Sequence, residues 1–173
     1  IQMKKIAFIL ILICTILSVY SANLTTAQIV QLANSKSISA ISSIAGKNGY
    51  KLAYKKEGAK GYEGYNVMDM AWAFNTTYNP TLNRWVPFGD FSAIKLLYNN
   101  DTNQPEVIVY VVSDGANFHQ IKNQITSYGY TLFEEDTTSH SDAIGYCYYN
   151  DILKLFAIFY EYDDGSYEIQ FYR

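Results

Sequence analysis

Histidines and carboxylates are the side chains that most often carry catalysis or hold metals, and their spacing in this chain is uninformative. The only two histidines are His119 and His140. His119 lies in a predicted helix, and the residue four positions later is not the second ligand that a helical zinc site needs. His140 stands in a polar run beside Ser141 and Asp142, whereas the members of a catalytic triad come from separate elements.

Two acidic clusters, at residues 134–136 and 163–164, lie near the ends of predicted strands. Glycoside hydrolysis needs two carboxyl groups about 5 to 10 Å apart across a cleft, and nothing in the sequence places the clusters so. Charges at strand ends are typical of solvated sheet edges. We therefore expect no metal, no cofactor and no catalytic site, and a protein that is not an enzyme.

Tyrosine is the most informative residue type, because the chain contains 17 of them. In the predicted strand 143–149, Tyr146 and Tyr148 share one face, and the small residues Ala143, Gly145 and Cys147 share the other. Small residues fit under a helix, so we expect both tyrosines on an open sheet face, with Tyr160 and Tyr162 from the strand 153–162. Tyrosine is favoured at protein interfaces and sugar platforms. The alternative is that a loop or another copy of the chain covers this face.

The connection over residues 75–90 is long for a compact domain, and such connections are often functional. It contains Arg84, Trp85 and Phe88, which are residue types that anchor protein interfaces. We take these three as further candidate binding residues. Alternatively, the two aromatic rings cover the edge of the core and the arginine pairs with an acidic residue.

The elements that position these residues follow from hydrophobic periodicity. Two short helices are expected between residues 25 and 48, and a third from residue 115 to Gly129. Each helical stretch precedes four runs rich in β-branched and aromatic residues. The predicted strands cover residues 50–56, 65–74, 92–98, 106–113, 130–135, 143–149, 153–162 and 167–172.

This order suggests an internal duplication, with a first unit at residues 22–115 and a second at residues 116–173. The segment Gly49–Leu52 is similar to Gly129–Leu132, and the order of elements repeats. The sequence therefore predicts an α+β protein. Two tandem units, each a helical part followed by four strands, would form one continuous antiparallel sheet with helices on one face. A single domain with unrelated hairpins is the alternative.

This layout resembles the beta-lactamase inhibitory protein family in length, duplication and element order, although no sequence motif carries the resemblance. In that family, two tandem helix-and-sheet units form one curved sheet with an aromatic-rich concave face. The resemblance implies this architecture for the present chain. The chain departs from the family in lacking its disulfides and in having one clear helix in the second unit.

The first 21 residues are typical of a secretory signal peptide, since basic residues 4–5 precede a largely apolar run at residues 6–19. That run is shorter than a membrane-spanning segment of about 18 to 20 residues. We expect cleavage near Ser21 or Ala22, export to the periplasm or the exterior, and no stable membrane insertion afterwards. An uncleaved anchor is the alternative. Cleavage would leave Cys147 as the remaining cysteine, so no intramolecular disulfide is expected.

The net charge is −3, which argues against a nucleic-acid partner. Residues 22–115 carry a net +1 and residues 116–173 a net −6. In a continuous duplicated sheet, this difference makes one end basic and the other acidic, and such polarity steers a complementary partner. The alternative is that this charge difference has no function and reflects evolutionary drift on a solvated surface.

These observations together predict an exported, non-enzymatic binding or inhibitory protein. It would contact another protein through the aromatic sheet face and the connection at residues 75–90. A toxin-immunity protein belongs to the same class. The alternative is a module that binds a carbohydrate or another small molecule, with a glycan stacked on the same tyrosines.

Overall fold

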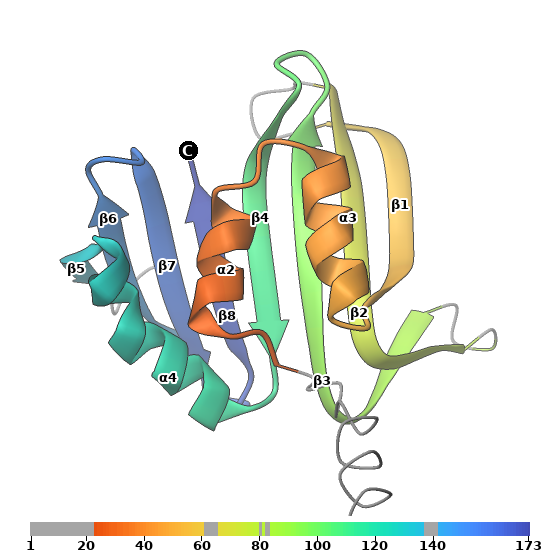
Figure 1. Cartoon of the computed structure of the whole chain (residues 1–173). Helices are drawn as coiled ribbons and strands as arrows, with labels where there is room; N and C mark the ends of the chain where they lie inside the picture. The colour runs from red at the N-terminus through yellow and green to blue at the C-terminus, as the bar shows by residue number, and fades with distance from the viewer. Residues whose placement is uncertain (1–22, 61–65, 80, 82–83, 137–141) are drawn as a thin grey trace, which may run out of the picture.

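The computed structural model describes residues 23–60, 66–79, 81, 84–136 and 142–173 (Figure 1). The predicted signal peptide at residues 1–21 and His140 lie outside the described residues. The helices are α2 (Thr26–Ala33), α3 (Ile38–Lys47) and α4 (Gly115–Gln124), which continues into the 3-10 turn η1 (Ile125–Tyr128). The strands are β1 (Lys51–Lys60), β2 (Asn66–Asn79), β3 (Arg84–Asn99), β4 (Gln104–Val112), β5 (Thr131–Asp136), β6 (Ala143–Asn150), β7 (Leu155–Tyr162) and β8 (Tyr167–Tyr172).

The eight strands of the described chain form one antiparallel sheet in the order β1-β2-β3-β4-β8-β7-β6-β5. The first four strands make one half of the sheet, and the last four make the other half in mirrored order. The halves join where β4 pairs with β8, from Val107 opposite Tyr172 to Val112 opposite Tyr167. Figure 1 shows the three helices lying over one face of the sheet. The predicted α+β fold is confirmed, while an origin by duplication stays a prediction.

Side-chain caps start all three described helices. The Thr25 hydroxyl accepts a hydrogen bond from the Gln28 amide at 3.3 Å, and the Gln28 side chain accepts one from the Thr25 amide at 2.8 Å. Ser37 caps α3, and Asp114 caps α4. Such caps satisfy amide groups that the first turn leaves without partners. None of the described helices has the length and apolar character needed to cross a membrane.

The hydrophobic core lies between the helices and the face that they cover. Helical side chains such as Ile29, Ile41 and Phe118 are fully buried there. They pack against strand residues such as Ile94 and Phe159, which are equally inaccessible. Burying an aliphatic or aromatic side chain contributes about 1.5 to 3 kcal/mol. Packing on the sheet therefore supplies most of the stability of these short helices, which are marginal in isolation.

Polar contacts join the two halves through the helix layer. The Thr26 hydroxyl donates to the Gln124 side-chain oxygen at 2.7 Å. The Arg173 guanidinium donates to the main-chain oxygens of Ala33 at 3.0 Å and Ser35 at 3.3 Å. A cation at this position satisfies carbonyl groups left free at the end of α2. Helix α2 is thus held by residues from the second half of the sequence.

A hairpin arm replaces most of the connection that we predicted over residues 75–90. Residues 76–79 of β2 pair with residues 84–87 of β3, so the prediction of a long irregular connection is wrong. The ladder breaks between Phe74 and Thr76, and Asn75 and Gly89 adopt positive φ angles of 53° and 61°. This bulge absorbs the break and lets pairing resume beyond it. Figure 1 shows the arm bending away from the body of the sheet.

Candidate binding surface

The register shows which residues lie on the face that the described helices leave uncovered. Directly paired residues in antiparallel strands share a face, and successive residues alternate. Ile108 and Tyr110 of β4 are buried under the helices, so Val107, Val109 and Val111 lie on the opposite face, which we call the open face. One row of open-face residues, from β1 to β5, is Tyr54, Ala71, Lys95, Val109, Gln170, Ile158, Cys147 and Glu134.

The open face is hollowed near its middle, over β3, β4 and β8. We call this site the central hollow, and its volume is about 630 Å³. A contiguous apolar hollow on a surface typically marks an interaction site. The sequence contained a signal for it, because both faces of the run at residues 106–113 are apolar, yet it was not among the predicted site residues. The lining residues are Leu97, Glu106, Val107, Val109, Gln170, Tyr172 and Arg173.

Tyr160 and Tyr162 lie on the open face beside this hollow, where we expected them. Their ring centroids are 6.1 Å apart. Tyr160 is buried, and Tyr162 is half-buried. Burial raises the pKa of Tyr162 to about 12, and the neighbouring Glu168 carboxylate adds to this shift. The Tyr162 hydroxyl therefore stays protonated over the physiological range.

Tyr146 and Tyr148 face the helices, so their expected placement on the open face is wrong. Tyr148 is 8% exposed, and its ring centroid lies 5.3 Å from that of Phe159 in the core. The Lys122 amino group of α4 lies 2.9 Å from the centre of the Tyr146 ring. The large rings fill the space under α4, while Gly145 lies on the open face opposite Tyr160. A residue without a Cβ leaves room there for the phenol ring.

Charged side chains separate along the open face. The strand order places the segment with net +1 at one end of the sheet and the segment with net −6 at the other. Asp69 of β2 is an acidic exception within the basic end. The separated lysines and glutamates of the open face are Lys51, Lys56 and Lys95 in the first half of the sheet and Glu168 and Glu134 in the second half.

Phe88 stands at the base of the arm and is 56% exposed. That exposure disagrees with the alternative that its ring covers the edge of the core. The backbones of Arg84 and Trp85 pair with Asn79 and Tyr78, and their side chains lie outside what the structure describes. A binding role for these two residues stays a prediction.

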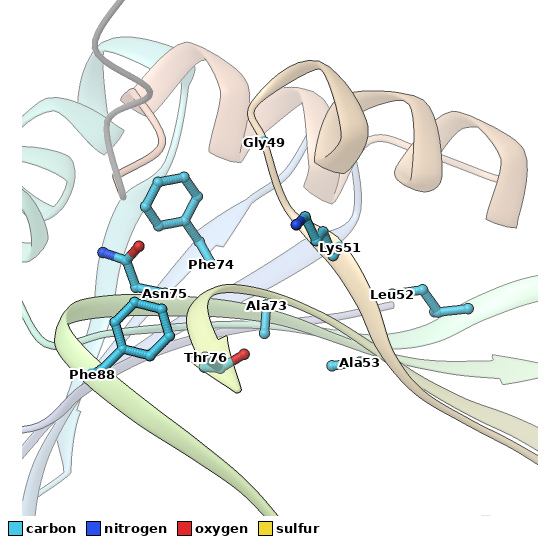
Figure 2. Close-up of a pocket in the computed structure, with 9 residues that line it drawn as sticks. All are labelled: Gly49, Lys51, Leu52, Ala53, Ala73, Phe74, Asn75, Thr76 and Phe88. Carbon is cyan, nitrogen blue, oxygen red and sulfur yellow. The ribbon is translucent and has the colours of Figure 1, made fainter. Parts of the chain in front are cut away.

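Phe88 also lines a second hollow, of about 360 Å³, at the junction of β1, β2 and the arm (Figure 2). We call it the arm hollow. Its walls come from the start of β1 and from the bulged part of β2, two segments that lie about 20 residues apart in the sequence. The lining residues are Gly49, Lys51, Leu52, Ala53, Ala73, Phe74, Asn75, Thr76 and Phe88.

One group of titratable side chains lies on the helix-covered side, and its strand and helix members are far apart in the sequence. The Lys122 amino group lies 2.8 Å from the Glu161 carboxylate, and His119 Nδ1 lies 4.0 Å from the same oxygen. These contacts tie α4 to β7. In the part of the chain that the structure describes, no three histidine, cysteine, aspartate or glutamate side chains are arranged to hold a metal ion.

Comparisons with profiles of protein families, with curated proteins and with solved structures each found no match. The functional argument therefore depends on the geometry of the open face, the central hollow and the arm hollow.

Proposed function

We propose that this chain is a non-enzymatic binding protein that holds another protein on its open face. The observation that carries the proposal is the central hollow, an apolar depression between tyrosines on one side and lysines on the other. Interfaces concentrate their binding energy in a few pockets that exclude water, and they use charged rims for orientation. The open face offers both features on one surface.

The sheet holds this surface ready for binding. Val107 and Val109 belong to a central strand that pairs with β3 on one side and β8 on the other. Their backbone is therefore ordered before a partner arrives, and binding does not have to supply that ordering free energy. A protruding apolar side chain of the partner fits the hollow, and its burial contributes about 1.5 to 3 kcal/mol.

The proposal includes export and a tandem origin for the two halves. The basic and apolar pattern of residues 1–21 supports export. The mirrored strand order on the two sides of the β4–β8 junction supports the tandem origin. An inhibitor of another exported protein, as in the family that the sequence layout resembles, belongs to this functional class.

A capture experiment with two charge variants tests the proposal. Val109→Glu places a carboxylate in the central hollow, while Thr126→Glu adds the same charge at an exposed position of η1. The immobilised wild-type protein and Thr126→Glu should retain the same partner from extracts of the source cells. Val109→Glu should retain at least tenfold less, because a partner that fills the hollow would have to remove water from the new carboxylate, and pairing with the neighbouring Lys95 offsets only part of that cost.

Thermal unfolding of both variants shows that the comparison concerns folded proteins. Equal capture by Val109→Glu and by the wild type would contradict the proposal. A glycan panel provides the competing outcome: a thermal shift with a sugar that disappears in Tyr162→Phe or Tyr172→Phe would favour the carbohydrate module instead.

A further inference from the structure

We infer that the arm hollow binds an aromatic group that carries a carboxylate, presented by the protein partner. This inference depends on the proposed function, since it names a chemical feature of that partner. The hollow is about 360 Å³, at the small end of the roughly 300 to 1,000 Å³ that ligand pockets occupy. It therefore holds one large side chain or chain end, and not an extended segment.

Charge is the first argument, because Lys51 is the single charged residue in the lining. No salt bridge involves Lys51 among the described residues, whereas Lys55 on the same strand pairs with Glu57 at 2.6 Å. Figure 2 shows the Lys51 amino group turned toward the side of the hollow formed by Phe74 and Asn75. An anion held there gains a favourable interaction, and a cation is repelled.

The apolar walls supply the second argument. Phe88 and Leu52 are 56% and 51% exposed, which is high for large hydrophobic side chains in the same small hollow. Phe74 also lines the hollow, and its ring centroid lies 5.8 Å from that of the buried Tyr50. An aromatic ring that enters the hollow and contacts Phe88 or Phe74 removes apolar surface from water.

The backbone keeps the hollow open without a partner. The register shift at Asn75 redirects the arm relative to the rest of β2, and the Asn75 side-chain amide donates to the Asp90 main-chain oxygen at 2.6 Å. Asn75 itself holds a positive φ of 53°, a conformation that costs free energy and is often retained at binding sites. The shape therefore exists before binding, which lowers the ordering cost.

Small probes can test this chemistry before the partner is known. N-acetylphenylalanine carries the ring and the carboxylate, its amide analogue carries the ring alone, and N-acetylglycine carries the carboxylate alone. We expect N-acetylphenylalanine to bind with a Kd on the order of 1 mM, as its size allows. Nitrogen–proton correlation spectra should place the shifted amide signals at Lys51, Leu52, Thr76 and Phe88.

The neutral amide should bind about two- to fivefold more weakly, which is the size expected for an ion pair open to water. Lys51→Gln should abolish this preference, while the matched Lys55→Gln should retain it. Phe88→Ala should weaken both ring-bearing probes. Equal binding of acid and amide by the wild type, or shifts centred away from the arm hollow, would overturn the inference.

Two further measurements distinguish a failure of this inference from a failure of the proposed function. Val109→Glu should leave probe binding unchanged, so a failure of the central hollow as a protein site and a failure of the arm hollow are distinguishable. Free 3-phenylpropionate should bind no more tightly than N-acetylphenylalanine. If 3-phenylpropionate instead bound ten times more tightly than N-acetylphenylalanine, the arm hollow would be a small-molecule site, and the assignment to a protein partner would be overturned.

Discussion

At the scale of single residues, two lysines show how burial decides how much an ion pair contributes to stability. Lys122 lies 2.8 Å from Glu161 with 15% of its side chain exposed, and Lys154 lies 2.7 Å from Asp151 with 70% exposed. Lys122 also covers the Tyr146 ring at 2.9 Å. The contacts are equally short, but water and ions weaken only the exposed pair strongly.

We therefore expect Lys122→Met to lower the free energy of unfolding by about 1 to 2 kcal/mol, because Glu161 loses its cation and Tyr146 its covering charge. Lys154→Met should cause no measurable loss. Urea denaturation of both variants measures the two changes in unfolding free energy, with the same dependence of that free energy on urea concentration (the m value) used for each. Equal losses of unfolding free energy in the two variants would show that burial does not decide how much each ion pair stabilises the fold.

Protonation of tyrosines gives a second prediction at this scale. Burial raises the pKa of Tyr130 from the ordinary 10.0 to about 12, with the nearby Arg173 opposing the shift. Tyr162 is raised to about 12 as well. Below pH 10 these tyrosines are protonated in both states, and their contribution to stability is complete. As the pH rises through 10 toward 12, the unfolded chain releases protons that the folded protein retains, so stability falls.

We expect these tyrosines to leave the denaturant midpoint unchanged from pH 8 to about pH 10 and to lower it between about pH 10 and pH 11. Tyr130→Phe should make the decline shallower, and Tyr128→Phe, at an exposed position, is the matched control. A decline of the same steepness in Tyr130→Phe would exclude this residue as a source of the pH dependence.

At the scale of elements, we expect alanine to have opposite effects on stability at two glycine positions. Gly46 lies in α3 with an ordinary helical conformation, and Gly89 at the base of the arm has a φ of 61°. A Cβ at either position would meet nothing within 4 Å. Conformation alone therefore decides the outcome.

Gly46→Ala should raise the free energy of unfolding by about 0.5 to 1 kcal/mol, since alanine is the better helix former. Gly89→Ala should lower it by about 1 to 2 kcal/mol, because an L-residue resists the left-handed region. Thermal and urea unfolding of both variants provide the test. A stabilising Gly89→Ala would mean that the arm relaxes to another conformation.

The sequence predicted the elements well because their signals are local. Strands such as β4 and β7 have dense β-branched and aromatic residues and end at turn-forming residues, and the helix starts at Ser37 and Asp114 have recognisable caps. The arm was missed because Asn75 and Gly89 are typical of loops. Only the pairing partner, residues 84–87, shows that the ladder resumes beyond them.

The faces of the sheet were harder to predict than the strands. Alternation shows which residues share a face, but both faces of β6 and β7 carry aromatic or aliphatic residues, so the pattern does not tell which face the helix covers. Tyr146 and Tyr148 were assigned to the wrong face because the small residues Gly145 and Cys147 were expected to lie under a helix. The central hollow combines residues from β3, β4 and β8, and such a combination depends on the strand order, which no local signal contains.

At the scale of the whole molecule, the two halves share too many contacts to unfold separately. Six residue pairs join β4 to β8, Thr26 bonds to Gln124, and Arg173 holds the end of α2. Phe118 of α4 belongs to the same buried cluster as Ile29 of α2. Loss of either half would expose apolar surface of the other to water.

We therefore expect a single cooperative unfolding transition. Both tryptophans, Trp72 and Trp85, belong to the first half, so tryptophan fluorescence monitors that half, while far-ultraviolet circular dichroism monitors the whole sheet. The substitution Ile169→Val in β8, at a fully buried position, should cost about 0.5 to 1.5 kcal/mol. It should move the fluorescence and dichroism midpoints equally, although it lies in the second half. A dichroism change that precedes the fluorescence change, in the wild type or in Ile169→Val, would show that the halves are separate folding units.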